Sequence, residues 1–214
     1  MRILDWPAGR TFTRAHPHMF GSTEFDQRPV GIADARFSPL ELAGDIVPVI
    51  YGGADDRTAT AETVFHLLPD GDRPRRIRRS AYTTWQWSTV HPNRDLRLAA
   101  IDATHPEATT LVDGGAPTYA EVRDATARLL VAQPDIDGLV WASRQLHDRP
   151  SAMTVDLSST DVSIVLFGPT AGRAGGVRRE ELGSTDPAVL FVSATGWLRL
   201  LRVGTELDVT VVVS

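Results

Sequence analysis

The chain has 214 residues, of which 42% are hydrophobic and 23% are charged, and its formal net charge is −5. This is the composition of an ordinary soluble protein, and no apolar run approaches the roughly 20 residues that a membrane span needs. The chain contains no cysteine, which excludes disulfides, a thiol nucleophile and a cysteine zinc site. All 22 basic residues are arginine, which excludes Schiff-base lysines, a P-loop lysine, a Ser-Lys dyad and the kinase strand lysine. Any anion must therefore be bound by arginine or by backbone N–H groups.

Composition and the N-terminal residues also bear on the partners and the cellular location of the protein. The negative net charge argues against binding of the whole protein to nucleic-acid phosphates. The first ten residues, MRILDWPAGR, lack the apolar stretch of a signal peptide. Together with the absence of cysteine, this predicts a cytoplasmic protein.

In the first part of the chain, alternating apolar residues predict strands at 10–16, 32–37 and 46–53. A helix is expected at about 56–68, where Asp55 or Thr58 can serve as the N-cap. The segment "DRPRRIRRS", residues 72–80, then packs five arginines into nine residues. We interpret it as a solvated connection or an edge strand; the alternatives are a docking site for an acidic partner segment or positive charge beside a bound phosphate.

In the second part, the clearest helix is at 118–133, where Thr118 and Glu121 predict a capping box. Further strands are expected at 83–90, 95–102, 136–143, 161–168, 188–194 and 206–213. Strands outnumber helices and often follow one another directly, which excludes a regular β-α-β alternation and predicts a mixed α/β (α+β) fold. Without a repeat or a low-complexity linker, residues 1–214 are expected to form a single domain. The tail after residue 170 is expected to be an exposed loop followed by C-terminal strands.

Several common motifs are absent or incomplete. The six histidines match no metal-ligand spacing, so no metal is expected. The "GRAGG" segment at 172–176 lacks the spacing of a dinucleotide-binding turn, and Ser143 lacks the glycines of a nucleophile elbow. Trp85 and Trp87 lie two apart on a predicted strand, which is typical of core or interface packing.

Five residues from separate predicted elements form an ordered set: Arg14, Arg36, Tyr51, Glu62 and Ser143. Their segments, "TFTRAH", "ARFSPL", "VIYGGADDRTATAE", "IDGLVWASR" and "SIVLFG", together resemble the RES domain, a family of bacterial toxins named for arginine, glutamate and serine. The resemblance covers about residues 10–168. The chain departs from the family pattern at Ala35, where glycine is usual, at Ser38, where asparagine is usual, and at Gly52-Gly53, where Leu-Ala is usual.

The resemblance implies a fold like that of ADP-ribosyltransferases, in which a mainly antiparallel, split sheet surrounds a cleft for NAD. It implies an enzyme that cleaves the nicotinamide–ribose bond of NAD, with phosphate or water as the acceptor. NAD would be a substrate, and no prosthetic group is expected. The alternatives are transfer of ADP-ribose to a protein or nucleotide target, and a binding module without turnover. A helix-turn-helix antitoxin of the Xre type is the implied protein partner, while the oligomeric state stays open.

The resemblance also suggests roles for individual residues. Glu62 would stabilise the positive charge that builds on the ribose as nicotinamide leaves. Arg14 and Arg36 would hold the pyrophosphate or, in one case, the attacking phosphate. Tyr51 would offer its ring to nicotinamide, and Ser143 would donate a hydrogen bond to the ribose or to Glu62.

His16 lies two positions after Arg14 on the same predicted strand and should face the same side. Two interpretations stay open for this residue. It is either a cleft residue that contacts NAD or a structural histidine, and the second is favoured.

Overall fold

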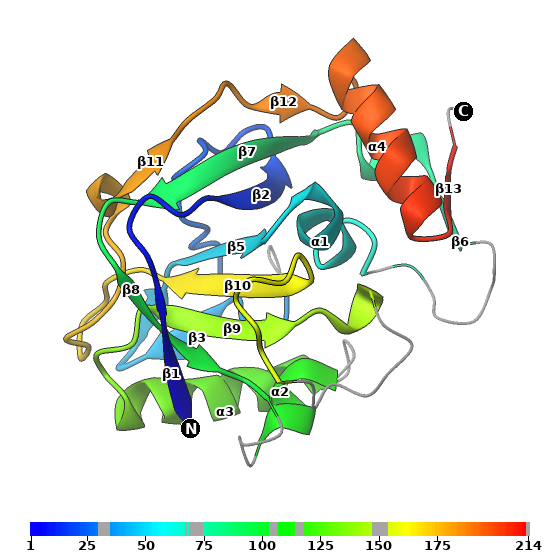
Figure 1. Ribbon diagram of the computed structural model, residues 1–214. Coiled ribbons are helices and arrows are strands. Elements are labelled where there is room, and N and C mark those ends of the chain that lie inside the picture. Colours follow the sequence, from blue (N-terminus) through cyan, green and yellow to red (C-terminus); the bar gives the residue numbers. More distant parts are fainter. Residues whose placement is uncertain are drawn as a thin grey trace.

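The computed structural model describes residues 1–29, 35–66, 68, 75–102, 107–113, 118–146 and 154–212. Most of the strands in these ranges belong to one nine-stranded sheet (Figure 1). They are Arg2–Trp6 (β1), Phe12–Pro17 (β2), Val49–Gly53 (β5), Trp85–Pro92 (β7), Leu96–Ala100 (β8), Gly138–Ala142 (β9), Val162–Phe167 (β10), Leu182–Ser184 (β11) and Val189–Leu190 (β12).

The spatial order of the sheet is β1-β8-β9-β10-β5-β2-β7-β11, and β12 also pairs with β7. Neighbouring strands are antiparallel except for β8 and β9, which run parallel. The predicted mixed α/β class with a mainly antiparallel sheet is thereby confirmed. The predicted strands at 10–16, 46–53, 83–90, 95–102, 136–143 and 161–168 are also confirmed to within a few residues.

Four α-helices, three single-turn 3-10 helices and two small sheets complete the described chain. The α-helices are Asp56–Ala61 (α1), Ala108–Asp113 (α2), Tyr119–Ala132 (α3) and Ala194–Glu206 (α4). The small sheets pair Leu40–Leu42 (β3) with Asp45–Val47 (β4), and Arg75–Ile77 (β6) with Val209–Val211 (β13). The arginine run thus contributes a short edge strand, one of the two interpretations favoured from sequence.

The apolar core lies on both faces of the sheet. Helices α2 and α3 cover one face, where Leu111 and Val122 belong to the same buried cluster as Leu139 and Val165 (Figure 1). Helices α1 and α4 pack together on the same face, beside β7 at the other end of the molecule, around Trp87. The site described below lies between these two groups of helices.

The sheet is nearly divided at one seam. Strands β2 and β5 are neighbours, but they meet at a single register pair, Thr13 with Gly53. On its other edge β2 pairs with β7 over six residues, and β5 pairs with β10 over five. Beyond Thr13 and Gly53 the two strands therefore diverge, and the bridge between Asp26 and Val49 closes the far end of the gap.

Helix α1 is shorter than the sequence predicts. Asp55 caps its start, as expected, by accepting a hydrogen bond from the Thr58 N–H at 2.8 Å. The helix ends at Ala61 rather than at residue 68, and Glu62 is its C-cap. Threonine hydroxyls explain the early end, because Thr60 and Thr63 donate to backbone carbonyls four residues earlier, which weakens and bends a helix.

Four other sequence predictions are wrong in whole or in part. Residues 35–38 form a turn closed by an isolated bridge, whereas residues 32–34 of the strand predicted at 32–37 lie outside the described residues. Thr118 is the N-cap of α3, but its side chain makes no capping hydrogen bond, so the capping box is not formed. The strands predicted at 188–194 and 206–213 shrink to β12 and β13 because α4 occupies residues 194–206.

The missed helix α4 contains two glycines, which lower helix propensity and hide the pattern. The glycines have a packing reason. A Cβ at Gly196 would lie 1.8 Å from the Leu190 carbonyl oxygen, and one at Gly204 would lie 2.7 Å from the Val209 oxygen. The buried positions 196, 200, 203 and 204 nevertheless follow helical spacing.

Candidate active site

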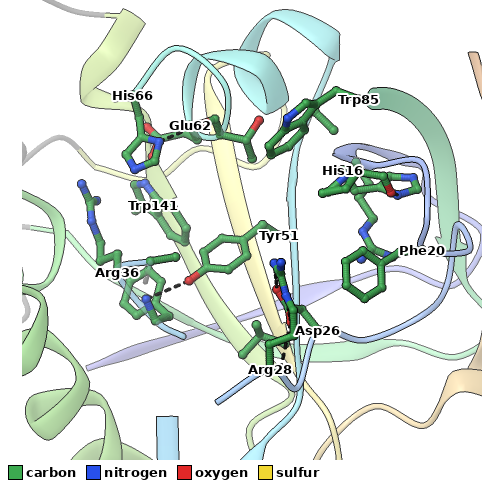
Figure 2. A pocket seen from close by; sticks show the side chains of 17 residues that line it. His16, Phe20, Asp26, Arg28, Arg36, Tyr51, Glu62, His66, Trp85 and Trp141 are labelled. Atoms are coloured by element: carbon green, nitrogen blue, oxygen red, sulfur yellow. Dashed lines mark hydrogen bonds and ion pairs between the residues drawn. The ribbon is translucent and has the colours of Figure 1, made fainter. Parts of the chain in front are cut away.

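A pocket of about 300 Å³ opens where β2 and β5 diverge. Its walls come from β2, β5, the turn after α1, the loop between β2 and β3, and the side chains of Trp85 and Trp141. In Figure 2, Tyr51 lies in the middle of the lining, with Arg36 on one side and His16 on the other. The split in the sheet therefore creates the pocket.

Glu62 reaches this pocket from the C-cap of α1. Its Oε1 accepts a hydrogen bond from the Ser143 hydroxyl at 2.6 Å. Ser143 follows β9, is fully buried and does not line the pocket. Ser143 therefore orients the carboxylate and cannot contact a ligand in the pocket. Of its two predicted roles, the geometry permits the hydrogen bond to Glu62 and not the one to the ribose.

Arg14 lines the same pocket from β2 and is 4% exposed. Its Nη1 donates to the carbonyls of Gly21 and Ser22, each at 3.0 Å. Burial lowers the pKa of Arg14 to about 10, although the negative charges of Asp26 and Glu24 oppose the shift. The side chain thus remains a cation at neutral pH, and its Nε and Nη2 have no hydrogen-bond partner among the described residues.

Arg36 lines the pocket from the turn before β3 and is 8% exposed. Its Nη1 is buried without a hydrogen-bond partner in the described chain, and so is the indole Nε1 of Trp141 in the same lining. A buried donor without an acceptor costs about 1–3 kcal/mol of stability. Two such donors around one pocket fit a ligand rich in acceptor atoms, such as a phosphate group.

Tyr51 points into the pocket from β5, and its hydroxyl accepts the Phe37 N–H at 2.8 Å. Its ring also stacks on Phe37, with 6.3 Å between centroids. Burial raises the pKa of the Tyr51 hydroxyl above its ordinary value, so the group is neutral. Tyr51 thus provides an uncharged aromatic wall of fixed orientation.

Of the predicted residues, the pocket brings together Arg14, His16, Arg36, Tyr51 and Glu62. Comparison with known families gives one match. The family model of the RES domain matches residues 11–185. The chain belongs to the RES domain family. No curated protein and no solved structure gives a significant match.

Membership of the RES domain family supports a toxin-like, NAD-related module in general. The match contains every residue of the pocket and ends before α4. Within the described residues, no group of three histidine or carboxylate side chains is arranged to hold a metal ion. In the same ranges, no helix combines the length and apolarity required to cross a membrane.

Both ring nitrogens of His16 form hydrogen bonds within the wall of the pocket. Its Nδ1 lies 3.1 Å from the Pro17 carbonyl and its Nε2 lies 2.8 Å from the Ser88 hydroxyl. Because a carbonyl can only accept, Nδ1 carries the proton and Nε2 accepts from Ser88. Burial first, and then the charge of Arg14, lower the pKa of His16 to about 3. These bonds suit the structural interpretation, although the ring also faces the pocket.

Protonation of His16 is expected to destabilise the protein in acid. The unfolded chain takes up this proton near pH 6.5, whereas the folded chain does so only near pH 3. The stability from the neutral imidazole is therefore complete above pH 6.5 and lost progressively toward pH 3. Between pH 7 and pH 5, His16 should account for a loss of about 2 kcal/mol in the free energy of unfolding. Urea unfolding of wild type and His16→Gln across this range measures it, and parallel pH curves would contradict the assignment.

Several pocket residues were not predicted as site residues. Trp85 was expected only to pack, His66 was tested only against metal-ligand spacing, and no role was predicted for Trp141 or the Asp26–Arg28 pair. Arg28 donates to both carboxylate oxygens of Asp26, at 2.9 and 2.7 Å. Burial alone would raise the pKa of Asp26, but the hydrogen bonds from Arg28 outweigh it and hold the pKa below its usual value.

The Gly52-Gly53 departure from the usual RES pattern has a steric explanation. A Cβ at Gly52 would lie 2.5 Å from the ring of Phe12, and one at Gly53 would lie 2.5 Å from the backbone nitrogen of Ala59 in α1. The two glycines thus allow β5 to approach β2 and α1 where the sheet begins to divide. This proximity brings Tyr51 and Glu62 to one pocket.

We expect Gly53→Ala to lower the free energy of unfolding by about 2 kcal/mol, because the backbone of α1 cannot move away from the added methyl group. Urea unfolding is the measurement. Gly21→Ala is the matched control, since its added Cβ would meet nothing closer than 3.6 Å. Equal midpoints for the two variants would show that α1 does not pack as closely as described.

Proposed function

We propose that this RES domain cleaves the nicotinamide–ribose bond of NAD and transfers the ADP-ribose unit to inorganic phosphate or water. The observation that carries the proposal is the meeting of Glu62 and Arg14 in one open pocket. The other pocket carboxylate, Asp26, is neutralised by Arg28. Among the described residues Glu62 has no ion pair, and its bond from Ser143 leaves the charge available for a ligand.

The proposed reaction matches the charges of the lining. As the C–N bond breaks, its electron pair neutralises the pyridinium nitrogen and nicotinamide leaves, while the ribose carbon becomes positive. A carboxylate beside that carbon stabilises the transition state more than the ground state. A phosphate oxygen then bonds to the same carbon and gives ADP-ribose 1″-phosphate; with water the product is ADP-ribose.

We assign the parts of NAD to different parts of the pocket lining. A volume near 300 Å³ is at the lower end for small-molecule sites, so it would enclose the nicotinamide ribose end rather than the whole dinucleotide. Tyr51 and Trp85 offer aromatic faces for nicotinamide. Arg14 and Arg36 offer guanidinium groups for phosphate oxygens.

The test is to incubate the purified chain with NAD, with and without phosphate, and to identify the products by mass spectrometry. Release of nicotinamide together with ADP-ribose 1″-phosphate, or with ADP-ribose when phosphate is absent, supports the proposal. Unchanged NAD over hours overturns it, and calorimetry then distinguishes a silent binding module. Labelled ADP-ribose fixed to a macromolecule in a lysate overturns it in favour of a transferase.

A further inference from the structure

Helix α4 lies outside the family match, yet it packs against α1, the helix that ends at Glu62. Leu200 and Val203 of α4 belong to the same buried cluster as Ala59 and Ala61 of α1. Figure 1 shows α4 beside α1, on the side of α1 that is away from α2 and α3. The C-terminal part of this chain therefore adds a contact to the candidate active site.

Asp56 joins the two helices. It is the first residue of α1 and is 8% exposed. Its Oδ2 accepts from Arg199 Nε at 2.6 Å and also from Arg202, and its Oδ1 accepts the Arg57 N–H at 3.0 Å. A buried carboxylate needs such partners, and these fix the start of α1 to α4.

The same arginine is connected to the end of α1 through Trp87. The Arg199 guanidinium lies 4.8 Å from the centroid of the Trp87 ring. Phe191 stacks on the same ring, with 3.7 Å between the ring centroids. The indole Nε1 of Trp87 donates to Thr60 Oγ1 at 2.9 Å. Thr60 precedes Glu62 by two residues, so Arg199 contacts groups that hold both ends of α1.

A six-residue helix depends on such contacts. Isolated helices shorter than about 12 residues are marginal in water, because nucleation costs more than so few hydrogen bonds return. The backbone position of Glu62 therefore depends on the tertiary contacts of α1, including those of Asp56 and Trp87. Ser143 orients the carboxylate, but it cannot fix the helix.

We propose that Arg199 is a positioning residue for Glu62, acting through Asp56 and Trp87, and that α4 thereby holds the reactive carboxylate in place. The inference rests on the proposed function, because it assigns Glu62 a role in catalysis. Arg199 does not line the pocket, so its effect should appear in turnover and not in substrate binding. A misplacement of a reacting group by about 1 Å is sufficient to slow a reaction by up to about a hundredfold.

The kinetic test compares Arg199→Gln with Arg2→Gln. Both variants remove a partly exposed arginine that is paired with a buried aspartate. The side-chain exposures are 29% for Arg199 and 10% for Asp56. They are 38% for Arg2 and 2% for Asp102. We expect Arg199→Gln to lower kcat for NAD by roughly tenfold with KM unchanged, and Arg199→Lys to recover most of the loss. Arg2→Gln, at the edge strand β1, should keep wild-type kcat. Equal kcat values in the two glutamine variants, or a change in KM alone, would overturn the proposal.

Hydrogen exchange tests the same connection without NAD. The N–H groups of Glu62 and Phe65 donate to the carbonyls of Thr58 and Thr60, so their exchange reports opening of α1. Arg199→Gln should accelerate exchange in residues 58–66 while Arg2→Gln does not, whether or not NAD proves to be the substrate. If Arg199→Gln fails to fold, the more exposed Arg202→Gln should show a smaller change of the same kind. Unchanged exchange in this segment would overturn the positioning role.

Discussion

Glu62→Gln is expected to lower kcat for NAD cleavage by about a hundredfold or more, with KM changed only slightly. Glutamine keeps the shape of the side chain and an oxygen that can accept the Ser143 hydroxyl, so the pocket should stay intact. Only the negative charge is removed, and that charge matters most as the ribose becomes positive. Steady-state kinetics of nicotinamide release measure the effect, and circular dichroism checks the fold.

The matched control is Glu121→Gln, which removes an exposed glutamate from the first turn of α3. It should keep the wild-type rate. Ser143→Ala separates two roles for that hydroxyl, because a nucleophile would be as essential as Glu62, whereas a group that only orients the carboxylate should cost roughly tenfold. A Glu62→Gln enzyme with wild-type turnover would remove Glu62 from the reaction altogether.

The sequence predicted most strands of the sheet because each has a local pattern, which is alternation in β7 and a largely apolar run in β9 and β10. It did not predict β1, whose residues Arg2–Trp6 are fixed by pairing with β8 nearly a hundred residues later. Helix α4 was missed for a related reason. Its two glycines make sense only when the carbonyls of Leu190 and Val209 are known to lie against them.

The site shows the same limit. Arg14 and Glu62 were found because their local segments resemble a family, and their common pocket was inferred from that resemblance. Trp141 lies in an apolar strand that is typical of a protein core. No local pattern shows that its indole N–H lacks a hydrogen-bond partner in the described chain and lines the same pocket as Arg36. Likewise, nothing near Asp56 in the sequence indicates Arg199, because the contact joins residues 143 positions apart.

Arg36→Met is expected to make the protein more stable and less active at the same time. Methionine fills a similar space without the buried, unpartnered Nη1, so the free energy of unfolding should rise by about 1 kcal/mol. The same change removes a cation from the pocket, so NAD turnover should fall by at least about tenfold through weaker binding of phosphate oxygens. Urea unfolding and steady-state kinetics on one preparation measure the two effects.

The opposite signs of these two effects distinguish a ligand-binding arginine from a structural one. Arg123, which also reaches this turn, donates to the carbonyls of Ala35 and Ser38 at 3.3 and 3.4 Å. Arg123→Met should therefore lower stability, since it removes two hydrogen bonds that Arg123 donates to this turn. Added phosphate should raise the melting temperature of wild type and of Arg123→Met, but not that of Arg36→Met. If Arg36→Met were destabilised, its guanidinium would have to be satisfied within the protein, and the anion-binding role would fail.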